Sequence, residues 1–149
     1  MISAVFDKQL MISVNNKVGT LADVTSIISS SGINLIAICA YAIEDMVAIC
    51  AYAVNQKVAL MFVTEDNNEA RKILEDQGYQ VREEEVILLS VENKPGALQA
   101  VTDKIAEAGI DLTLIYGSAE KEGKFSRIVL ISRDNMEVMM VIKMMLERS

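Results

Sequence analysis

Histidine and tryptophan are absent from this chain of 149 residues, which also contains only one proline, two cysteines, three phenylalanines and four tyrosines. Histidine is the commonest general base and a common metal ligand, so its absence removes the usual centre of acid–base and metal chemistry. No GxSxG motif, Walker loop or metal-spaced acidic set takes its place. We therefore expect a protein that is not an enzyme and that has no catalytic residue, no metal and no cofactor.

Basic charge is also scarce, because 14 Lys and Arg residues stand against 21 Asp and Glu residues and leave a net charge of −7. Nucleic-acid binding draws most of its affinity from Lys and Arg contacts with phosphates. Recognition of single-stranded RNA also needs aromatic side chains on which bases stack, and the few Phe and Tyr residues do not form such a pattern. We expect no nucleic-acid partner.

Long hydrophobic runs are missing as well. No apolar run approaches the roughly 18 residues of a membrane span, and Asp7 and Lys8 interrupt the N-terminal run too early for a signal peptide. Cys39 and Cys50 lie in apolar, strand-like runs without a CxxC spacing, so we interpret them as buried free thiols in a reducing compartment. These features predict a cytoplasmic protein with no membrane partner.

The chain contains two copies of one pattern. Residues 14–21 and 91–98 match at an offset of 77 residues and keep Val, Asn, Lys, Gly and Leu at equivalent places. Residues 32–35 and 109–112 repeat the same offset. A period this long, shared by two separate blocks, indicates the tandem duplication of a small domain and not a solenoid.

Each copy has a β-α-β-β-α-β pattern, and we place the two domains at residues 1–78 and 79–149. Branched apolar residues precede each repeated block, and an amphipathic helical pattern follows it. In the first copy the predicted strands are 10–14, 33–43, 58–64 and 79–85, and the predicted helices begin at Gly19 and Asn67. In the second copy the predicted strands are 86–93, 110–119 and 124–132, and the predicted helices are 95–108 and 135–146.

The second copy lacks residues for its last strand, because the chain ends at Ser149. At the same offset of 77 residues, residues 2–6 align with residues 79–83, which belong to the predicted last strand of the first copy. We therefore predict that residues 1–6 supply the missing strand of the second domain.

One internal duplication breaks the symmetry between the copies. The hexapeptide at residues 37–42 recurs identically at 48–53, within the first copy. The extra segment that this duplication adds to the first copy must form a loop, an even number of extra chain reversals, an over-long strand or a swapped segment. A loop of Ile, Cys, Ala and Tyr would expose much apolar surface, so we favour pairing of the surplus with a sheet edge.

The repeated turn resembles that of the ACT domain, a βαββαβ unit with Asn-Lys/Arg-Pro-Gly-x-Leu after its first strand. Residues 93–98 fit this motif, and residues 16–21 depart from it only in having Val18 in place of proline. The resemblance covers nearly the whole chain, as in stand-alone tandem ACT proteins of bacteria. It implies an α+β fold of two ferredoxin-like ACT units, with antiparallel sheets and helices on one face. ACT domains pair through sheets or helices and commonly bind amino acids as allosteric effectors of metabolic enzymes.

The turn is chemically suited to an amino acid. A helix N-terminus offers N–H donors and a positive dipole end to a carboxylate, and Gly19 and Gly96 permit close approach. The resemblance assigns the ammonium to Asn34 or Asp111 of a facing unit, although the charged Asp111 stands where the family usually has Asn. The alternative is structural, with tight glycine turns and Asn side chains as local caps. The expected ligand-binding residues are Asn16, Val18, Gly19, Asn34, Leu35, Asn93, Pro95, Gly96, Asp111 and Leu112.

The function we expect is therefore a non-catalytic regulatory module that senses an amino acid at an interface between ACT units near the strand-to-helix turns. It would act as a homodimer or on a metabolic enzyme in trans. The alternative is a structural dimerisation module without a small-molecule ligand. The last predicted helix places Met140 and Met144 among Glu137 and Lys143 on its polar face, which marks either an adaptable interface or partial exposure without a partner.

Overall fold

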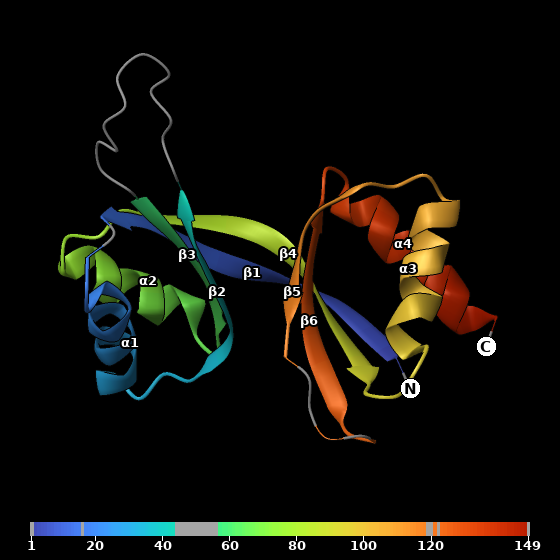
Figure 1. Cartoon of the computed structure of the whole chain (residues 1–149), viewed down its shortest axis with the longest axis horizontal. Helices are drawn as coiled ribbons and strands as arrows, with labels where there is room; N and C mark the ends of the chain where they lie inside the picture. The colour runs from blue at the N-terminus through green and yellow to red at the C-terminus, as the bar shows by residue number, and fades with distance from the viewer. Residues whose placement is uncertain (1, 16, 44–56, 119–120, 122, 149) are drawn as a thin grey trace, which may run out of the picture. The chain divides into compact units, whose positions relative to one another are not determined.

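The computed structural model describes residues 2–15, 17–43, 57–118, 121 and 123–148 (Figure 1). Asn16 and the second copy of the hexapeptide at 48–53 lie outside the described residues, and so does the predicted placement of the surplus segment. In chain order the elements are β1 (Ile2–Asn15), α1 (Thr20–Ser30), β2 (Leu35–Ile43), β3 (Lys57–Thr64), α2 (Asn67–Asp76), β4 (Val81–Glu92), α3 (Ala97–Glu107), β5 (Leu112–Gly117), β6 (Phe125–Ser132) and α4 (Asn135–Glu147). The predicted double β-α-β-β-α-β pattern is confirmed.

Two strands are longer than the sequence predicts. β1 continues through Asp7 and Lys8, where we expected an interruption, and β4 joins the predicted strands 79–85 and 86–93 into one. Side chains of a strand alternate between its faces, so a charged residue on an exposed face leaves the backbone ladder intact. Lys8 is exposed, as this explanation requires.

The chain divides into two compact units. The first unit comprises Gln9–Glu84, and the second comprises Met1–Lys8 together with Glu85–Ser149. β1 and β4 are thus each shared, with one part of the strand in each unit. Figure 1 shows helices on one face of the sheet in each unit.

The first unit has the strand order β2-β3-β1-β4, with antiparallel pairing of β3 to both β2 and β1. α1 and α2 cover one face because each helix places an apolar stripe against the sheet. Phe62 of β3 and Leu10 of β1 are fully buried at the centre of this contact. The buried core consists of Leu10, Ile12, Val24, Ile28, Leu60, Phe62, Ala70, Leu74 and Val81.

The second unit has the order β1-β4-β6-β5, with antiparallel pairing of β6 to β4 and β5. α3 and α4 cover its sheet, and Ile2 and Ala4 of β1 pack against the same core. N-terminal residues therefore contribute apolar contacts to the unit formed by the C-terminal half of the chain. The buried core consists of Ile87, Leu89, Val91, Val101, Ile105, Ile128, Leu130, Val138, Met139 and Ile142.

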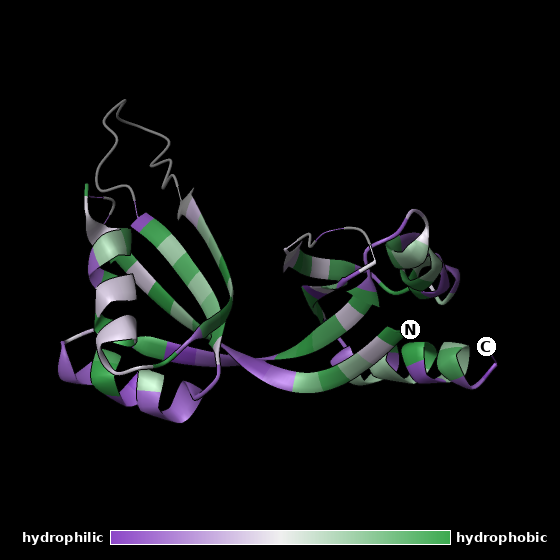
Figure 2. Ribbon diagram, turned by 90° about the horizontal axis from the view of Figure 1, so that it is seen from below, coloured by the Kyte–Doolittle hydropathy of each residue, from purple (hydrophilic) through white to green (hydrophobic). Residues whose placement is uncertain are grey.

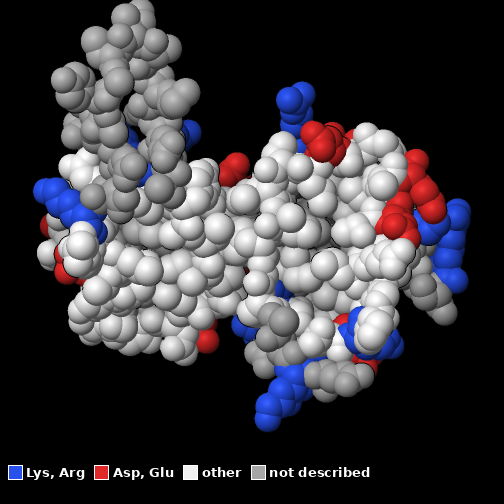
Figure 3. Space-filling view, viewed as in Figure 1, with Lys and Arg blue, Asp and Glu red and all other residues white. Residues whose placement is uncertain are grey.

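Figure 3 shows the distribution of charged side chains on one face of the molecule. On the described part of the face drawn in Figure 3, Lys and Arg side chains are interspersed with Asp and Glu. Over the described residues, no helix is long and apolar enough to cross a membrane. Within the same ranges, no group of three or more His, Cys, Asp or Glu side chains is arranged to hold a metal ion.

Candidate functional site

The repeated motif forms a type II β-turn in front of a helix. Ala97 N–H donates to the Lys94 carbonyl at 3.2 Å, and Gly96 has φ 83° and ψ −11°, the geometry of the third turn residue. Proline favours the second position of this turn, where Pro95 stands. Our prediction that the helix begins at Pro95 is therefore wrong, because the left-handed Gly96 separates the proline from the first helical residue, Ala97.

The first unit repeats this geometry. Thr20 N–H donates to the Lys17 carbonyl at 3.2 Å, and Gly19 has φ 91° and ψ −9°. Val18 takes the place of the proline and is fully exposed, so it makes no packing contribution that would demand a particular side chain. Asn16, the first residue of the predicted motif here, lies outside the described residues.

The four helices differ at their N-termini. The carboxylates of Asp66 and Asp134 accept from the third N–H groups of α2 and α4, at 3.1 Å and 3.0 Å. α1 and α3 instead begin at Gly19 and Gly96, which have no side chain to accept these N–H groups. No protein atom lies within 4 Å of a Cβ built on either glycine. The second and third N–H groups of α1 and α3 therefore have no side-chain cap, and no side chain on the preceding glycine hinders the approach of an anion.

In the second unit a groove of about 270 Å³ lies beside this turn. Asn93 anchors the turn to the β5–β6 hairpin, since its N–H donates to the Lys124 carbonyl at 2.7 Å and its carbonyl accepts from Gly123 N–H at 3.1 Å. Pro95 and Gly96 belong to the turn but do not line the groove. The lining residues are Val91, Glu92, Asn93, Lys94, Leu98, Ile115, Tyr116, Gly117, Ser118, Ser126 and Ile128.

Charge at this groove is paired. Lys94 Nζ lies 3.0 Å from Glu92 Oε2, and both side chains remain partly exposed. The hydrogen bond and charge of the Lys94 ammonium lower the pKa of Glu92. Gly117 also lines the groove, and a Cβ at this position would lie 2.6 Å from the Arg127 carbonyl oxygen. Only glycine fits at this point of β5 without displacing β6.

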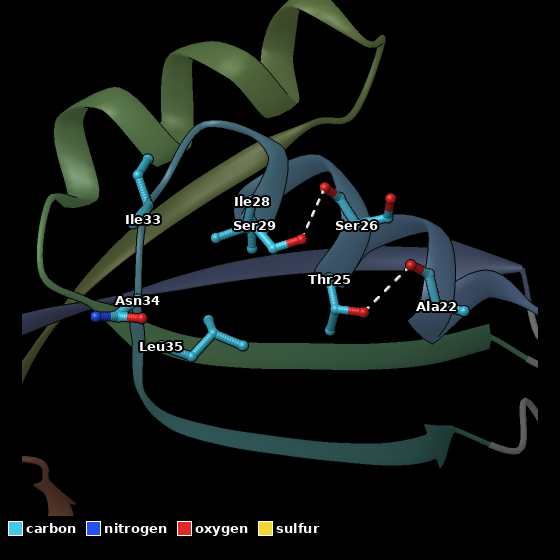
Figure 4. Close-up of a pocket in the computed structure, with 8 residues that line it drawn as sticks. All are labelled: Ala22, Thr25, Ser26, Ile28, Ser29, Ile33, Asn34 and Leu35. Atoms are coloured by element: carbon cyan, nitrogen blue, oxygen red, sulfur yellow. Dashed lines mark hydrogen bonds between the residues drawn. The ribbon is translucent and has the colours of Figure 1, made fainter.

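In the first unit a groove of about 390 Å³ lies between α1 and the start of β2 (Figure 4). Thr25 Oγ1 donates to the Leu21 carbonyl at 2.9 Å, and Ser29 Oγ donates to the Ser26 carbonyl at 3.1 Å. Asn34 Nδ2 lies 3.4 Å from Glu65 Oε2. The hydroxyl oxygens of Thr25 and Ser29 and the carboxamide oxygen of Asn34 can also accept hydrogen bonds in this groove. The lining residues are Ala22, Thr25, Ser26, Ile28, Ser29, Ile33, Asn34 and Leu35.

A further groove of about 600 Å³ lies at the N-terminal end of α1 and is lined by Lys17, Gly19, Thr20, Leu21, Ala22, Thr25, Ala40, Val58 and Leu60. Ala22 and Thr25 line both grooves of this unit, so the two adjoin along α1. Gly19 and Asn34 nevertheless lie beyond opposite ends of the helix, which spans about 16 Å at 1.5 Å per residue. Within one unit they do not meet around the same small group.

The remaining predicted residues lie at the starts of the edge strands. Leu35 and Leu112 pack against the cores of their units, which is a structural role for both. Asp111 is exposed immediately before β5, and no described contact brings it to the Asn93 groove. The ligand roles of these residues stay predictions.

Sequence reasoning missed several residues of the grooves. Thr25 and Ser29 were overlooked because an exposed hydroxyl on a helix is usually only solvated. Tyr116 and Ser118 reach the Asn93 turn through sheet pairing that joins distant segments. Gly117 carried a usable signal, since an isolated glycine in a strand pattern marks close approach of backbone.

Two βαββαβ units, each with a glycine turn leading into its first helix, define a tandem ferredoxin-like protein. The model of the family described as ACT domain pair matches residues 5–146, and the chain belongs to this family. The predicted ACT resemblance is thereby confirmed. Membership supports a regulatory role, since ACT domains are regulatory and not catalytic.

Solved structures share the fold. Protein BT0572 from Bacteroides thetaiotaomicron is 27% identical with a TM-score of 0.78, over 95% of this chain and 89% of that one. The regulatory subunit of aspartate kinase from Thermus flavus is 13% identical with a TM-score of 0.57, over 97% and 96%. Aspartate kinase from Clostridium acetobutylicum, described as an allosteric enzyme, is 11% identical with a TM-score of 0.56, over 97% of this chain and 33% of that one. A search of curated proteins finds no match.

Proposed function

We propose that this chain is a non-catalytic module that binds a free amino acid and thereby regulates a metabolic enzyme. The observation that carries the proposal is the contrast between the helix N-termini. α2 and α4 are closed by Asp66 and Asp134, whereas α1 and α3 follow glycine turns that leave their second and third N–H groups without a side-chain cap. The open N-termini are those of the repeated family motif.

The carboxylate of the amino acid would bind at these open N-termini. Backbone N–H groups and the positive end of the helix dipole both favour an anion. Lys17 stands beside Gly19 and lines the groove at the start of α1, where its ammonium adds positive charge. A side chain in place of Gly19 or Gly96 would require the left-handed backbone that only glycine adopts readily.

The ammonium would bind at acceptors such as those around Asn34. The hydroxyl oxygens of Thr25 and Ser29 and the carboxamide oxygen of Asn34 can accept hydrogen bonds there. This end of α1 is also the negative end of its dipole, which favours a cation.

One amino acid cannot touch both ends of the same α1, because its carboxylate and ammonium are joined through a single carbon whereas the helix spans about 16 Å. The ligand would therefore lie between the turn of one ACT unit and the strand start of a facing ACT unit. Asp111 stands in the second copy at the position equivalent to Asn34 in the first, so the two strand starts differ in charge. We therefore expect the two kinds of site to differ in their affinity for the amino acid.

The test is a thermal-shift screen of the twenty amino acids. A ligand at a hundred times its dissociation constant adds about 2.7 kcal/mol of stability. For a chain of this size the melting temperature would rise by about 5 to 10 °C. We expect one amino acid, or a few related ones, to produce this shift in the wild-type chain.

The matched variants are Asn34→Ala and Asn68→Ala, since both asparagines are exposed, Asn34 lines the groove of about 390 Å³, and Asn68 lines none of the grooves described above. Asn34→Ala should abolish the shift, and Asn68→Ala should retain it. A chain that responds to no amino acid would contradict the proposal and favour a structural dimerisation module without a ligand.

A further inference from the structure

A row of methionines lies on the outer surface of α4. Met136, Met140 and Met144 are 58%, 55% and 47% exposed and recur every four residues, so they form one ridge along the helix. The opposite side of α4 already supplies the core through Val138 and Ile142. Packing within the second unit therefore does not account for the methionine ridge.

The equivalent helix of the first unit provides an internal comparison. α2 and α4 begin with the same Asp-Asn pair, and this alignment places Met136, Met140 and Met144 at the positions of Asn68, Lys72 and Asp76. These α2 residues are also exposed. Figure 2 shows α2 as largely hydrophilic and α4 as richer in hydrophobic residues. The ridge is thus a property of α4 and not of the repeated fold.

Charged residues flank the ridge in a symmetric pattern. Glu137 and Lys143 each lie three residues from Met140, which puts them about 60° to either side of it around the helix. Both are exposed, and among the described residues neither makes an ion pair. Glu147, in the last turn of α4, is exposed and lies on the Lys143 side of the ridge.

We propose that the methionine ridge of α4 binds the same ridge of a second copy of this chain. Ridges of residues four apart interdigitate in the commonest class of helix packing, and a two-fold axis makes one surface complementary to itself. When this two-fold axis runs parallel to the ridge, the two α4 helices lie side by side in the same direction. Glu137 of each copy then lies on the same flank as Lys143 of the other. Each flank then carries Glu137 of one copy together with Lys143 and Glu147 of the other.

Other occupants fit this surface less well. An anionic membrane would require basic residues around the apolar ridge, but Glu137 and Glu147 stand beside it. A small ligand would require a hollow, and none of the grooves described above includes a residue of α4. A second copy satisfies both the apolar ridge and its flanks of mixed charge.

The first experiment measures the mass in solution by light scattering at tens of micromolar protein and low salt, because salt screens exposed ion pairs. We expect wild-type dimers and a monomeric Met140→Lys/Met144→Lys variant. Val5→Lys is the control for one such change, because Val5 has the same 55% exposure as Met140 and lies in the same unit. A monomeric wild type, or a double variant that stays dimeric, would overturn the proposal.

The second experiment tests the identity of the partner by exchanging charges. Glu137→Lys alone places lysines together, and Lys143→Glu alone places glutamates together, so we expect each variant to dimerise about tenfold more weakly. An equimolar mixture of the two variants pairs opposite charges on both flanks and should restore the dimer. If the mixture dimerises no better than its components, then Glu137 does not share a flank with Lys143 of another copy and the proposed pairing is wrong.

Discussion

Replacing Gly117 with alanine should destabilise the second unit through a direct clash. A Cβ at this position would lie 2.6 Å from the Arg127 carbonyl oxygen and 2.9 Å from Ile128 Cγ1. The carbonyl cannot easily move, since it accepts a hydrogen bond from Ser118 N–H at 3.2 Å. Overpacking of this kind costs about 1 to 3 kcal/mol. The melting temperature measured by circular dichroism should fall by about 2 to 12 °C.

Two comparisons separate this clash from a general intolerance of change. Ser118→Ala alters the exposed neighbour and should change stability by less than about 0.5 kcal/mol. Gly96 has positive φ but open space around it, so Gly96→Asn should be milder than Gly96→Ala, because Asn tolerates the left-handed backbone. At Gly117 the order should reverse, with Asn worse than Ala. A Gly117→Ala variant with the same melting temperature as the wild type would refute the reasoning from these distances.

Three further predictions concern stability. Deleting residues 1–6 removes the apolar contacts of Ile2 and Ala4, so we expect a loss of about 2 to 4 kcal/mol in chemical denaturation; an unchanged curve would argue against a strand supplied by the N-terminus. Asp134→Ala removes the cap of α4 and should cost about 1 kcal/mol in the same assay, whereas full stability would mean that the cap is dispensable. Lys94 lowers the pKa of Glu92 from its ordinary value of 4.5, so this pair stabilises the fold above that pH and loses its effect as the pH falls through the folded-state pKa. The Lys94→Ala variant should therefore have a lower melting temperature than the wild type at neutral pH and the same melting temperature in acid. A difference that persists in acid would exclude the ion pair as its cause.

The repeat made most of the fold predictable. A shared offset of 77 residues identified two copies, and the patterns around each copy identified their strands and helices. The glycines of the repeated motif identified the two turns, because glycine permits a tight connection between a strand and a helix. The error of two residues at the start of α3 arose because proline is favoured both in a first helical turn and at the second position of this turn.

The continuity of β1 and β4 was harder to predict. Asp7 and Lys8 appear as a charged break in the sequence, and residues 79–85 and 86–93 appear as two strands, yet β1 and β4 each continue without interruption. Backbone pairing does not require apolar side chains at exposed positions, so a charge run alone does not end a strand.

The grooves depend on contacts that no local pattern contains. Asn93 meets residues 123–124 through backbone hydrogen bonds across some 30 positions of sequence, and the hydroxyls of α1 meet Asn34 only after the helix packs on the sheet. The motif therefore identified Asn93 and Asn34, whereas Tyr116, Ser118 and Thr25 required the structure.

The most direct test of amino-acid binding is a titration of the ¹⁵N-labelled chain, followed through its backbone amide resonances. The account predicts that a recognised amino acid shifts the amides at the open starts of α1 and α3, together with that of Asn34. The amides at the starts of α2 and α4, which Asp66 and Asp134 cap, serve as controls within the same spectrum and should not move. If no amino acid shifts the second and third amides of α1 or α3, or if the capped helices respond equally, the proposed site is wrong.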